Sequence, residues 1–420
     1  MKPKIIAAAL LLVICGTSQA QLGNLLKKVK GKVNQRVNNK VDNAIDKSLD
    51  AIEGKGGNAA AANGSSDTAA AAVVSYAQYD FVPGEEVLYA NDFAHENQGE
   101  LPVGWNSSGN AAVVTLNTQK GNWLQVHQNT LTLTDNDSLF TGNCTVEFDI
   151  IFHQSFNGYV LPQLQFGLIG SGDLSSTDNA LLRNIEQGYA AEIKIQPGTQ
   201  NDTHLHLQTY ATGSLYLNTD IKNYRQMQAL YDKPVHVAIQ VQKERLRVWL
   251  NAEKMYDLPK AIPPGTILNQ LYFSLKSSAY NDAQNGYYIG NIKVARGLPD
   301  TRHKLVDEGK FTTTGILFNV NTADIQPESN GVLKEVASVL LQYPGIKILI
   351  TGHTDGDGSN EDNLVLSQKR ADAVKDALVN NYNIDASRIQ TTGKGEDEPV
   401  ADNNTRQGKA QNRRVEFSKL

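Results

Sequence analysis

Polar and charged side chains near the C-terminus have a spacing that could bind a charged ligand. Asp355 follows a predicted strand, at the edge where open α/β sheets place their ligand loops. Asn363, Ser367 and Arg370 are spaced by four and then three residues on a predicted helix, so they point from one face of it. Each residue alone would suit an ordinary ion pair or a helix cap. As a set in this order, they predict a ligand site with a carboxylate and a guanidinium.

Acidic residues also lie on a predicted strand in the middle of the chain. Glu147 and Asp149 fall in the run 147–152, which resembles the catalytic strand of concanavalin-like retaining glycosidases. Such enzymes need two carboxyl groups roughly 5 Å apart, and Phe152 occupies the position of the second. Because a strand alternates its faces, Glu147 and Asp149 share one face. We therefore expect a half-buried strand with a polar outer face and no enzymatic activity. A glycoside hydrolase is the alternative.

The segment around Asp355 alternates between strand and helix patterns. The predicted strands are residues 315–318, 346–351, 389–393 and 415–418, and the predicted helices are 328–341 and 360–380. This order predicts an α/β domain of βαβαβ type with a mixed sheet.

Four separated motifs in this segment are similar to those of a known family. Residues 318–321, 351–355, 366–371 and 412–415 occur in the order and spacing of OmpA-like domains. The resemblance covers residues 304–420 and implies a periplasmic domain that binds peptidoglycan. Its implied function is to anchor an envelope protein to the cell wall.

The resemblance also implies a ligand. OmpA-like domains recognise the diaminopimelate of the peptidoglycan stem peptide, whose side-chain end carries an ammonium and a carboxylate on one carbon. By position, Asp355 would hold the ammonium, and the planar fork of Arg370 would hold the carboxylate. Two further positions that match the family, Asn321 and Arg413, would line the site, and the helix spacing adds Asn363.

Residues 79–300 have a different pattern, in which short alternating segments are separated by turn clusters. This pattern predicts an all-β sandwich. Residues 91–105 and 245–251 resemble the first and late strands of concanavalin-like or laminin-G-like jelly rolls. The sandwich would present a surface for a glycan or an envelope protein.

Two alternatives for residues 79–300 remain open at this point. The three tryptophans, Trp105, Trp123 and Trp249, could stack on a sugar or belong to the core. An outer-membrane β-barrel would need strands of about ten residues with unbroken apolar alternation. Charged residues crowd the segment 243–247, which argues against a barrel.

The first twenty residues predict export. Residues 1–20 have a basic start, a short apolar run and a small-residue cleavage site, so the mature chain would begin at Gln21 in the periplasm, associated with the outer membrane and cell wall. A lipidated Cys15 is the alternative, although the preceding Ile14 is larger than a lipoprotein signal normally has.

Two segments link the export signal to the predicted sandwich. Residues 21–53 predict an amphipathic helix whose basic first half could contact an anionic membrane surface. Residues 54–78 consist almost entirely of Ala, Gly, Asn and Ser, which is typical of a flexible linker.

Composition excludes several other functions. A net charge of −5 gives no basic excess for nucleic acid. If Cys15 is removed with the signal, Cys144 has no partner for an intramolecular disulfide, and we expect a buried, inert thiol. No histidine or cysteine cluster has metal-ligand spacing, so we expect neither a metal nor a cofactor.

Overall fold

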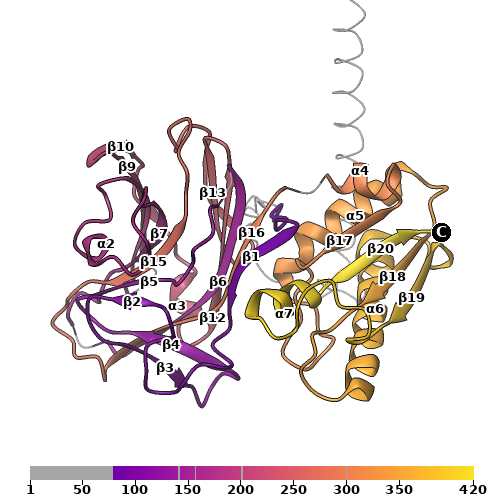
Figure 1. The fold of residues 1–420 in the computed structure, drawn as a ribbon, viewed down its shortest axis with the longest axis horizontal. Helices are drawn as coiled ribbons and strands as arrows, with labels where there is room; N and C mark the ends of the chain where they lie inside the picture. Colours follow the sequence, from indigo (N-terminus) through magenta and orange to yellow (C-terminus); the bar gives the residue numbers. More distant parts are fainter. Residues whose placement is uncertain (1–78, 141, 157, 200–201, 299) are drawn as a thin grey trace, which may run out of the picture.

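The computed structural model describes residues 79–420 except 141, 157, 200–201 and 299. The predictions for residues 1–78, namely the signal peptide, the amphipathic helix and the linker, lie outside the described residues. Within them, the chain forms two parts that lie side by side (Figure 1). Strands β1 to β16 form the first part, which we call the sandwich. The elements from α4 to β20 form the second, which we call the C-terminal domain.

One antiparallel sheet of the sandwich lies next to the C-terminal domain (Figure 1). Its strand order is β14-β13-β12-β6-β16-β4-β3, and β1 pairs with β16 as an eighth strand. The bounds are β1 (Glu86–Asn91), β3 (Ala111–Thr115), β4 (Asn122–Val126), β6 (Asn143–Gln154), β12 (Pro234–Gln242), β13 (Arg245–Leu250), β14 (Glu253–Leu258) and β16 (Asn285–Arg296).

The other antiparallel sheet of the sandwich has the order β10-β9-β8-β7-β15-β5-β2, with β11 paired to β9. The bounds are β2 (Asn106–Ser107), β5 (Thr130–Leu133), β7 (Leu164–Gly170), β8 (Tyr189–Gln196), β9 (His204–Ala211), β10 (Ser214–Asn218), β11 (Lys222–Asn223) and β15 (Gln270–Leu275). Two short helices, α2 (Asn179–Arg183) and α3 (Met227–Leu230), lie in its connections.

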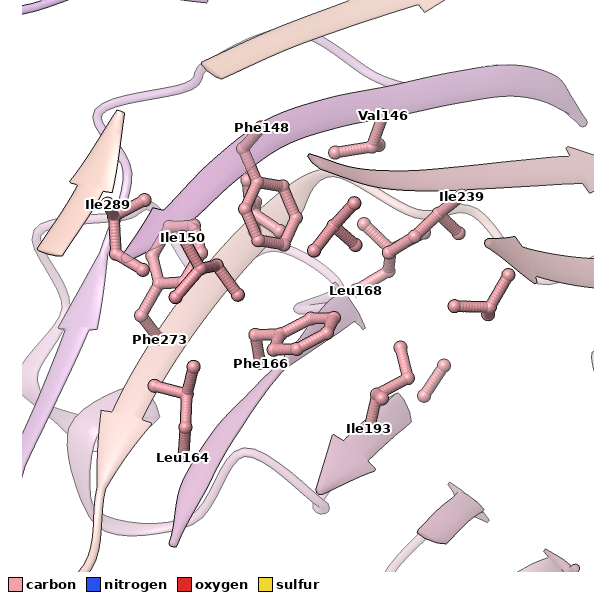
Figure 2. Packing of buried hydrophobic residues seen from close by; sticks show 14 of the residues in the cluster. Val146, Phe148, Ile150, Leu164, Phe166, Leu168, Ile193, Ile239, Phe273 and Ile289 are labelled. Carbon is pink, nitrogen blue, oxygen red and sulfur yellow. The ribbon is translucent and has the colours of Figure 1, made fainter. Parts of the chain in front are cut away.

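The two sheets pack face to face through apolar side chains. The ring of Phe148 on β6 meets the rings of Phe166 on β7 and Phe273 on β15, each with a centroid distance of 5.1 Å (Figure 2). Val146, Ile150 and Phe152 on β6 are buried with Phe148 in the same core, as the strand alternation predicted. Cys144, on the same strand, is also fully buried.

None of the three tryptophans offers an exposed ring for stacking on a sugar. Trp105 lies between Phe93 and Phe273, and Trp123 is only 4% exposed. Trp249 is fully buried against Tyr79 and Phe81, which precede the first strand. The structure therefore supports the alternative in which all three tryptophans belong to the core rather than to a sugar-binding surface.

The C-terminal domain contains a mixed four-stranded sheet with helices, as predicted. Its strand order is β17-β20-β18-β19, and only β18 and β19 are parallel. The strands are β17 (Lys310–Thr313), β18 (Ile348–Gly352), β19 (Ile389–Gly393) and β20 (Val415–Lys419). The helices are α4 (Thr301–Val306), α5 (Asn330–Gln342), α6 (Asn360–Tyr382) and α7 (Arg406–Asn412), with 3-10 turns at Pro327–Ser329 and Ala386–Arg388.

The predicted strand at residues 315–318 was wrong. The first strand of this sheet ends at Thr313, and Phe318 forms only an isolated bridge with Ile325. The N–H of Leu317 donates to the hydroxyl of Ser329, and its carbonyl accepts from the N–H of Gln326. These bonds hold the apolar run in a loop rather than in the sheet.

Helix α7 docks the C-terminal domain onto strand β1. Ala410 packs against Val87 and Ala90, and the side-chain oxygen of Gln411 accepts a 2.7 Å hydrogen bond from the N–H of Val87. The side-chain nitrogen of Gln411 donates to the carbonyl of Glu85. Gln411 therefore extends the hydrogen bonding of the edge strand across the interface.

Candidate functional site

A cavity of about 410 Å³ lies between the first sheet of the sandwich and the C-terminal domain. All five predicted site residues line it, namely Asn321, Asp355, Asn363, Arg370 and Arg413. They come from the loop after β17, the loop after β18, helix α6 and the turn before β20. The cavity thus brings the five predicted residues together, and further residues of the C-terminal domain that were not predicted, such as Thr314, Gln326 and His353, line it as well.

Asp355 is held at the end of β18 by close packing against helix α6. A Cβ atom on Gly352 would lie 2.3 Å from the carbonyl oxygen of Ser367, so only glycine allows this approach. Asp355 is 8% exposed, and its Oδ2 atom lies 2.5 Å from the guanidinium of Arg413. Its Oδ1 atom accepts a longer bond, 3.3 Å, from the N–H of Asp357.

Arg370 does not form the ion pair with Asp355 that a purely structural role would require. Its guanidinium lies over the ring of Phe318, 4.9 Å from the centroid, and its Nε–H donates to the carbonyl of Thr322 at 3.0 Å. Burial lowers the pKa of Arg370, with the charge of Asp355 opposing this and that of Arg413 adding to it. The two terminal nitrogens have no hydrogen-bond partner among the described residues. They remain available to a ligand carboxylate.

The other polar residues of α6 position loops. The Asn363 side chain donates to the carbonyls of Asp355 and Asp357 and, at 2.6 Å, to the carboxylate of Glu396. Ser367 accepts from the N–H of Gly395 and is fully buried. The predicted helix face thus includes two residues that fix the surrounding loops and one, Arg370, with free donors.

Asn321 lies in the loop after β17. It is exposed and has a left-handed backbone, with φ of 59°. Asparagine tolerates this conformation better than most residues. Its side chain lines the cavity next to Val320.

Ion pairs tie this wall to the sandwich. The Arg413 guanidinium lies 3.7 Å from Asp92 of the sandwich. Lys409, which pairs with Asp357 of its own domain at 2.7 Å, also lies 2.8 Å from the Nε2 atom of His95 in the sandwich. Arg406 bonds the carboxylates of Glu96 and Asp135 at 2.9 and 2.7 Å. The sequence analysis missed these residues because the partners of Arg406 lie 271 and 310 positions away, and no local pattern signals such a contact.

Charged residues of the sandwich form the opposite wall. Glu147 and Asp149 on β6, His236 on β12 and Lys293 on β16 line the cavity. The outer face of β6 is polar, as expected, but the expectation of a half-buried strand was wrong at Glu147, which is only 4% exposed. The C-terminal domain covers this face, so its charges are paired with one another rather than solvated.

The alternative of a glycosidase finds no support in this geometry. Phe152, at the position of the second catalytic carboxylate, points into the core on the opposite face from Glu147. Burial alone would raise the pKa of Glu147, but the charges of Lys293 and His236 outweigh it and lower the pKa to about 2. A carboxyl group with that pKa holds no proton to donate near neutral pH.

The described residues lack a membrane-spanning helix and a metal-binding cluster. No helix in this part of the chain is long and apolar enough to cross a membrane. No group of three or more His, Cys, Asp or Glu side chains within it could hold a metal ion.

Comparison with known proteins relates the C-terminal domain to one family. The model of the OmpA family matches residues 317–413. Outer membrane protein Omp38 of Acinetobacter baumannii is 45% identical over 100 residues, which are 24% of this chain and 28% of that protein. Outer-membrane lipoprotein YfiB of Pseudomonas aeruginosa is 34% identical over 164 residues, which are 38% of this chain and 95% of that protein.

A solved structure matches the same part of the chain. The peptidoglycan-associated lipoprotein from Burkholderia pseudomallei is 32% identical, with a TM-score of 0.24, and the match covers 25% of this chain and 88% of that one. The matches thus extend over only about a quarter of the length of Omp38 but nearly all of YfiB.

Proposed function

This chain belongs to the OmpA family through its C-terminal domain, and we propose that it binds peptidoglycan non-covalently through the diaminopimelate of the stem peptide. The protein is located in the periplasm, associated with the outer membrane and cell wall, as its outer-membrane relatives are. Binding there anchors the rest of the chain to the wall. These relatives are outer-membrane proteins and lipoproteins by name, not enzymes.

One observation carries the proposal, namely a carboxylate and a guanidinium that line the same cavity without neutralising each other. Asp355 is paired with Arg413, whereas the terminal nitrogens of Arg370 are free. A ligand carboxylate can accept two parallel bonds from such a fork. The ammonium on the same carbon of diaminopimelate then lies beside Asp355.

The sandwich is proposed to be a jelly roll of the concanavalin-like or laminin-G-like type that presents a glycan- or protein-binding surface. Two packed antiparallel sheets with one shared core support this fold assignment. Because its tryptophans are buried, such a surface would have to use other side chains. We assign it no enzymatic activity.

Sedimentation of the mature chain with peptidoglycan sacculi tests the wall-binding site. Asp355→Ala and Arg370→Ala should each weaken binding at least roughly thirtyfold, because each leaves a ligand charge without its counterion at a cost of about 2 to 5 kcal/mol. The matched controls are Asp376→Ala and Lys369→Ala, which remove exposed charges of the same signs from α6. They should sediment like the parent.

The composition of the cell wall allows a second comparison in this test. Sacculi with lysine in place of diaminopimelate keep the ammonium but lack the carboxylate, so they should bind weakly. If both site variants keep their circular dichroism spectra and still sediment like the parent, the ligand site lies elsewhere.

A further inference from the structure

The wall of the cavity that belongs to the sandwich is built from neighbouring strands. Glu147 pairs across the sheet with Lys293 on β16, and Asp149 pairs with His236 on β12. The four side chains therefore form one compact cluster on a sheet face that lines the same cavity as Asp355 and Arg370. Their formal charges cancel when His236 is protonated.

Each charge in this cluster has a defined partner. Lys293 lies 2.8 Å from Glu147, and the Nδ1 atom of His236 lies 2.8 Å from Asp149. Asn291 donates a 2.6 Å bond to the other oxygen of Asp149. Burial alone would lower the pKa of His236, but its hydrogen bond with Asp149 and the nearby charges of Asp149 and Glu147 raise the pKa to about 10. His236 is therefore an imidazolium with two N–H donors.

Only one of these two donors is used. The Nε2 atom of His236 lies 3.6 Å from Glu147, too far for a hydrogen bond, and it has no other partner in the described part of the chain. His236 is 8% exposed and lines the cavity. A buried charged donor without an acceptor is rare in folded proteins, so this N–H is a candidate donor to a bound ligand.

Two hydroxyl groups on the facing wall are also unpaired. The hydroxyls of Thr314 and Thr354 have no hydrogen-bond partner among the described residues, and these side chains are 6% and 4% exposed. Both residues line the cavity, and Thr354 directly precedes Asp355. Unfilled hydrogen-bonding capacity therefore lies on both walls of one cavity.

We propose that the sandwich forms the second wall of the peptidoglycan site. There the Nε2–H of His236, from the sandwich, and the hydroxyls of Thr314 and Thr354, from the facing C-terminal domain, bind oxygen atoms of the same stem peptide. This inference rests on the proposed function, since it assumes that diaminopimelate lies between Asp355 and Arg370. The stem peptide carries amide carbonyls and free carboxylates on either side of that residue, which are the acceptors that these donors lack.

The charge balance of the cluster suits such a ligand. Because Glu147 and Asp149 offset His236 and Lys293, the wall neither repels the ammonium nor competes for the carboxylate of diaminopimelate. It contributes directional hydrogen bonds instead. The same sheet face thus contacts the stem peptide beyond the zwitterionic end of diaminopimelate.

Calorimetry on the mature full-length chain tests this inference with two probes. The first is free meso-diaminopimelate, and the second is the tripeptide L-Ala-γ-D-Glu-meso-diaminopimelate. His236→Asn retains a donor near the Nδ1 position for Asp149 but removes Nε2. It should weaken tripeptide binding about tenfold, as loss of one charged hydrogen bond does, and change binding of the free amino acid less than about twofold.

Thr314→Val gives an independent variant that should fold, because it replaces a hydroxyl without a partner by a methyl group of the same shape. It should show the same selective loss of tripeptide affinity. Asp257→Asn is the matched control, since this carboxylate lies on β14 and pairs with Arg245 outside the cavity. It should bind both probes like the parent.

The outcomes separate the two proposals. If Asp355→Ala loses both probes while His236→Asn retains full tripeptide affinity, the sandwich wall does not contact the peptide and this inference is wrong, whatever Thr314→Val shows. Equal losses for both probes would assign His236 to domain docking and would also overturn it. If Asp355→Ala binds both probes normally, the proposed diaminopimelate site itself fails.

Discussion

Removing the cation of a buried ion pair should destabilise the sandwich far more than removing the cation of an exposed ion pair on the same strand. Lys293 lies 2.8 Å from Glu147, with side chains 12% and 5% exposed. Lys293→Met leaves the Glu147 carboxylate with His236 as its nearest cation, at 3.6 Å. Breaking a buried pair in this way costs about 3 kcal/mol or more. For a domain of this size, that corresponds to a fall in unfolding midpoint on the order of 6–12 °C.

Tryptophan fluorescence measures this effect in the sandwich alone, because all three tryptophans of the chain precede the C-terminal domain. The matched control is Arg296→Met on the same strand, whose pair with Glu86 is 45% and 56% exposed. It should cost at most about 1 kcal/mol. Adding Glu147→Gln to Lys293→Met should restore most of the stability, since no unpaired charge then remains.

The pH dependence of the same measurement has a defined sign. The pKa of Glu147 is lowered to about 2, so its contribution to stability is present above its ordinary value near 4.5 and is lost as the pH falls toward 2. In Lys293→Met, the carboxyl group of Glu147 protonates at a higher pH. The difference in stability between the variant and the parent should therefore decrease as the pH is lowered. If Lys293→Met and Arg296→Met lower stability equally at pH 7, the cluster is not a buried charge network.

Four further predictions follow from the sequence and the structure. Burial raises the pKa of the Cys144 thiol to about 12, so a thiol reagent at pH 8 should modify it only when the sandwich unfolds. Intact mass of protein from the native envelope should give a chain that starts at Gln21, and an acylated Cys15 would contradict this. Purified protein should not hydrolyse β-glucans; hydrolysis that is lost on Glu147→Gln would refute the absence of activity. The raised pKa of His236, about 10, contributes stability that is complete below about 6.5 and is lost toward pH 10, so tryptophan fluorescence should show a steeper alkaline loss for the parent than for His236→Asn.

Local patterns predicted several elements of both parts, because short-range physics determines them, but not α4, β17 or α7. The period-two alternation of β6 identified Val146, Phe148, Ile150 and Phe152 as its core face. Helix α6 begins one residue after Ser359, whose hydroxyl caps the N–H of Asp362, and the prediction placed its start correctly. The strand predicted at residues 315–318 failed because a side-chain hydroxyl twelve residues later competes for the backbone of that segment.

Contacts between the two parts could not be read from the sequence. Nothing around Glu147 indicates that its outward face is covered, because the covering segments are distant in sequence: Tyr79 and Phe81 precede it by more than 60 residues, and the C-terminal domain begins more than 150 residues later. The pairing of Asp355 with Arg413 links positions 58 residues apart, and no helical or strand period connects them. The family motifs brought these two residues into one predicted site, but only the folded chain shows which cation the carboxylate takes.

Because Asp355 pairs with Arg413 rather than with Arg370, the proposed site can bind both charges of its ligand. Arg413 occupies Oδ2 of Asp355, while Oδ1 accepts only a 3.3 Å bond from the N–H of Asp357. A carboxylate offers about four lone-pair positions, so Oδ1 can accept an ammonium donor without displacing Arg413. Had Asp355 paired with Arg370 instead, each ligand charge would have had to break an ion pair before it could bind. The guanidinium of Arg413 therefore holds the carboxylate in place and leaves Arg370 free for the ligand.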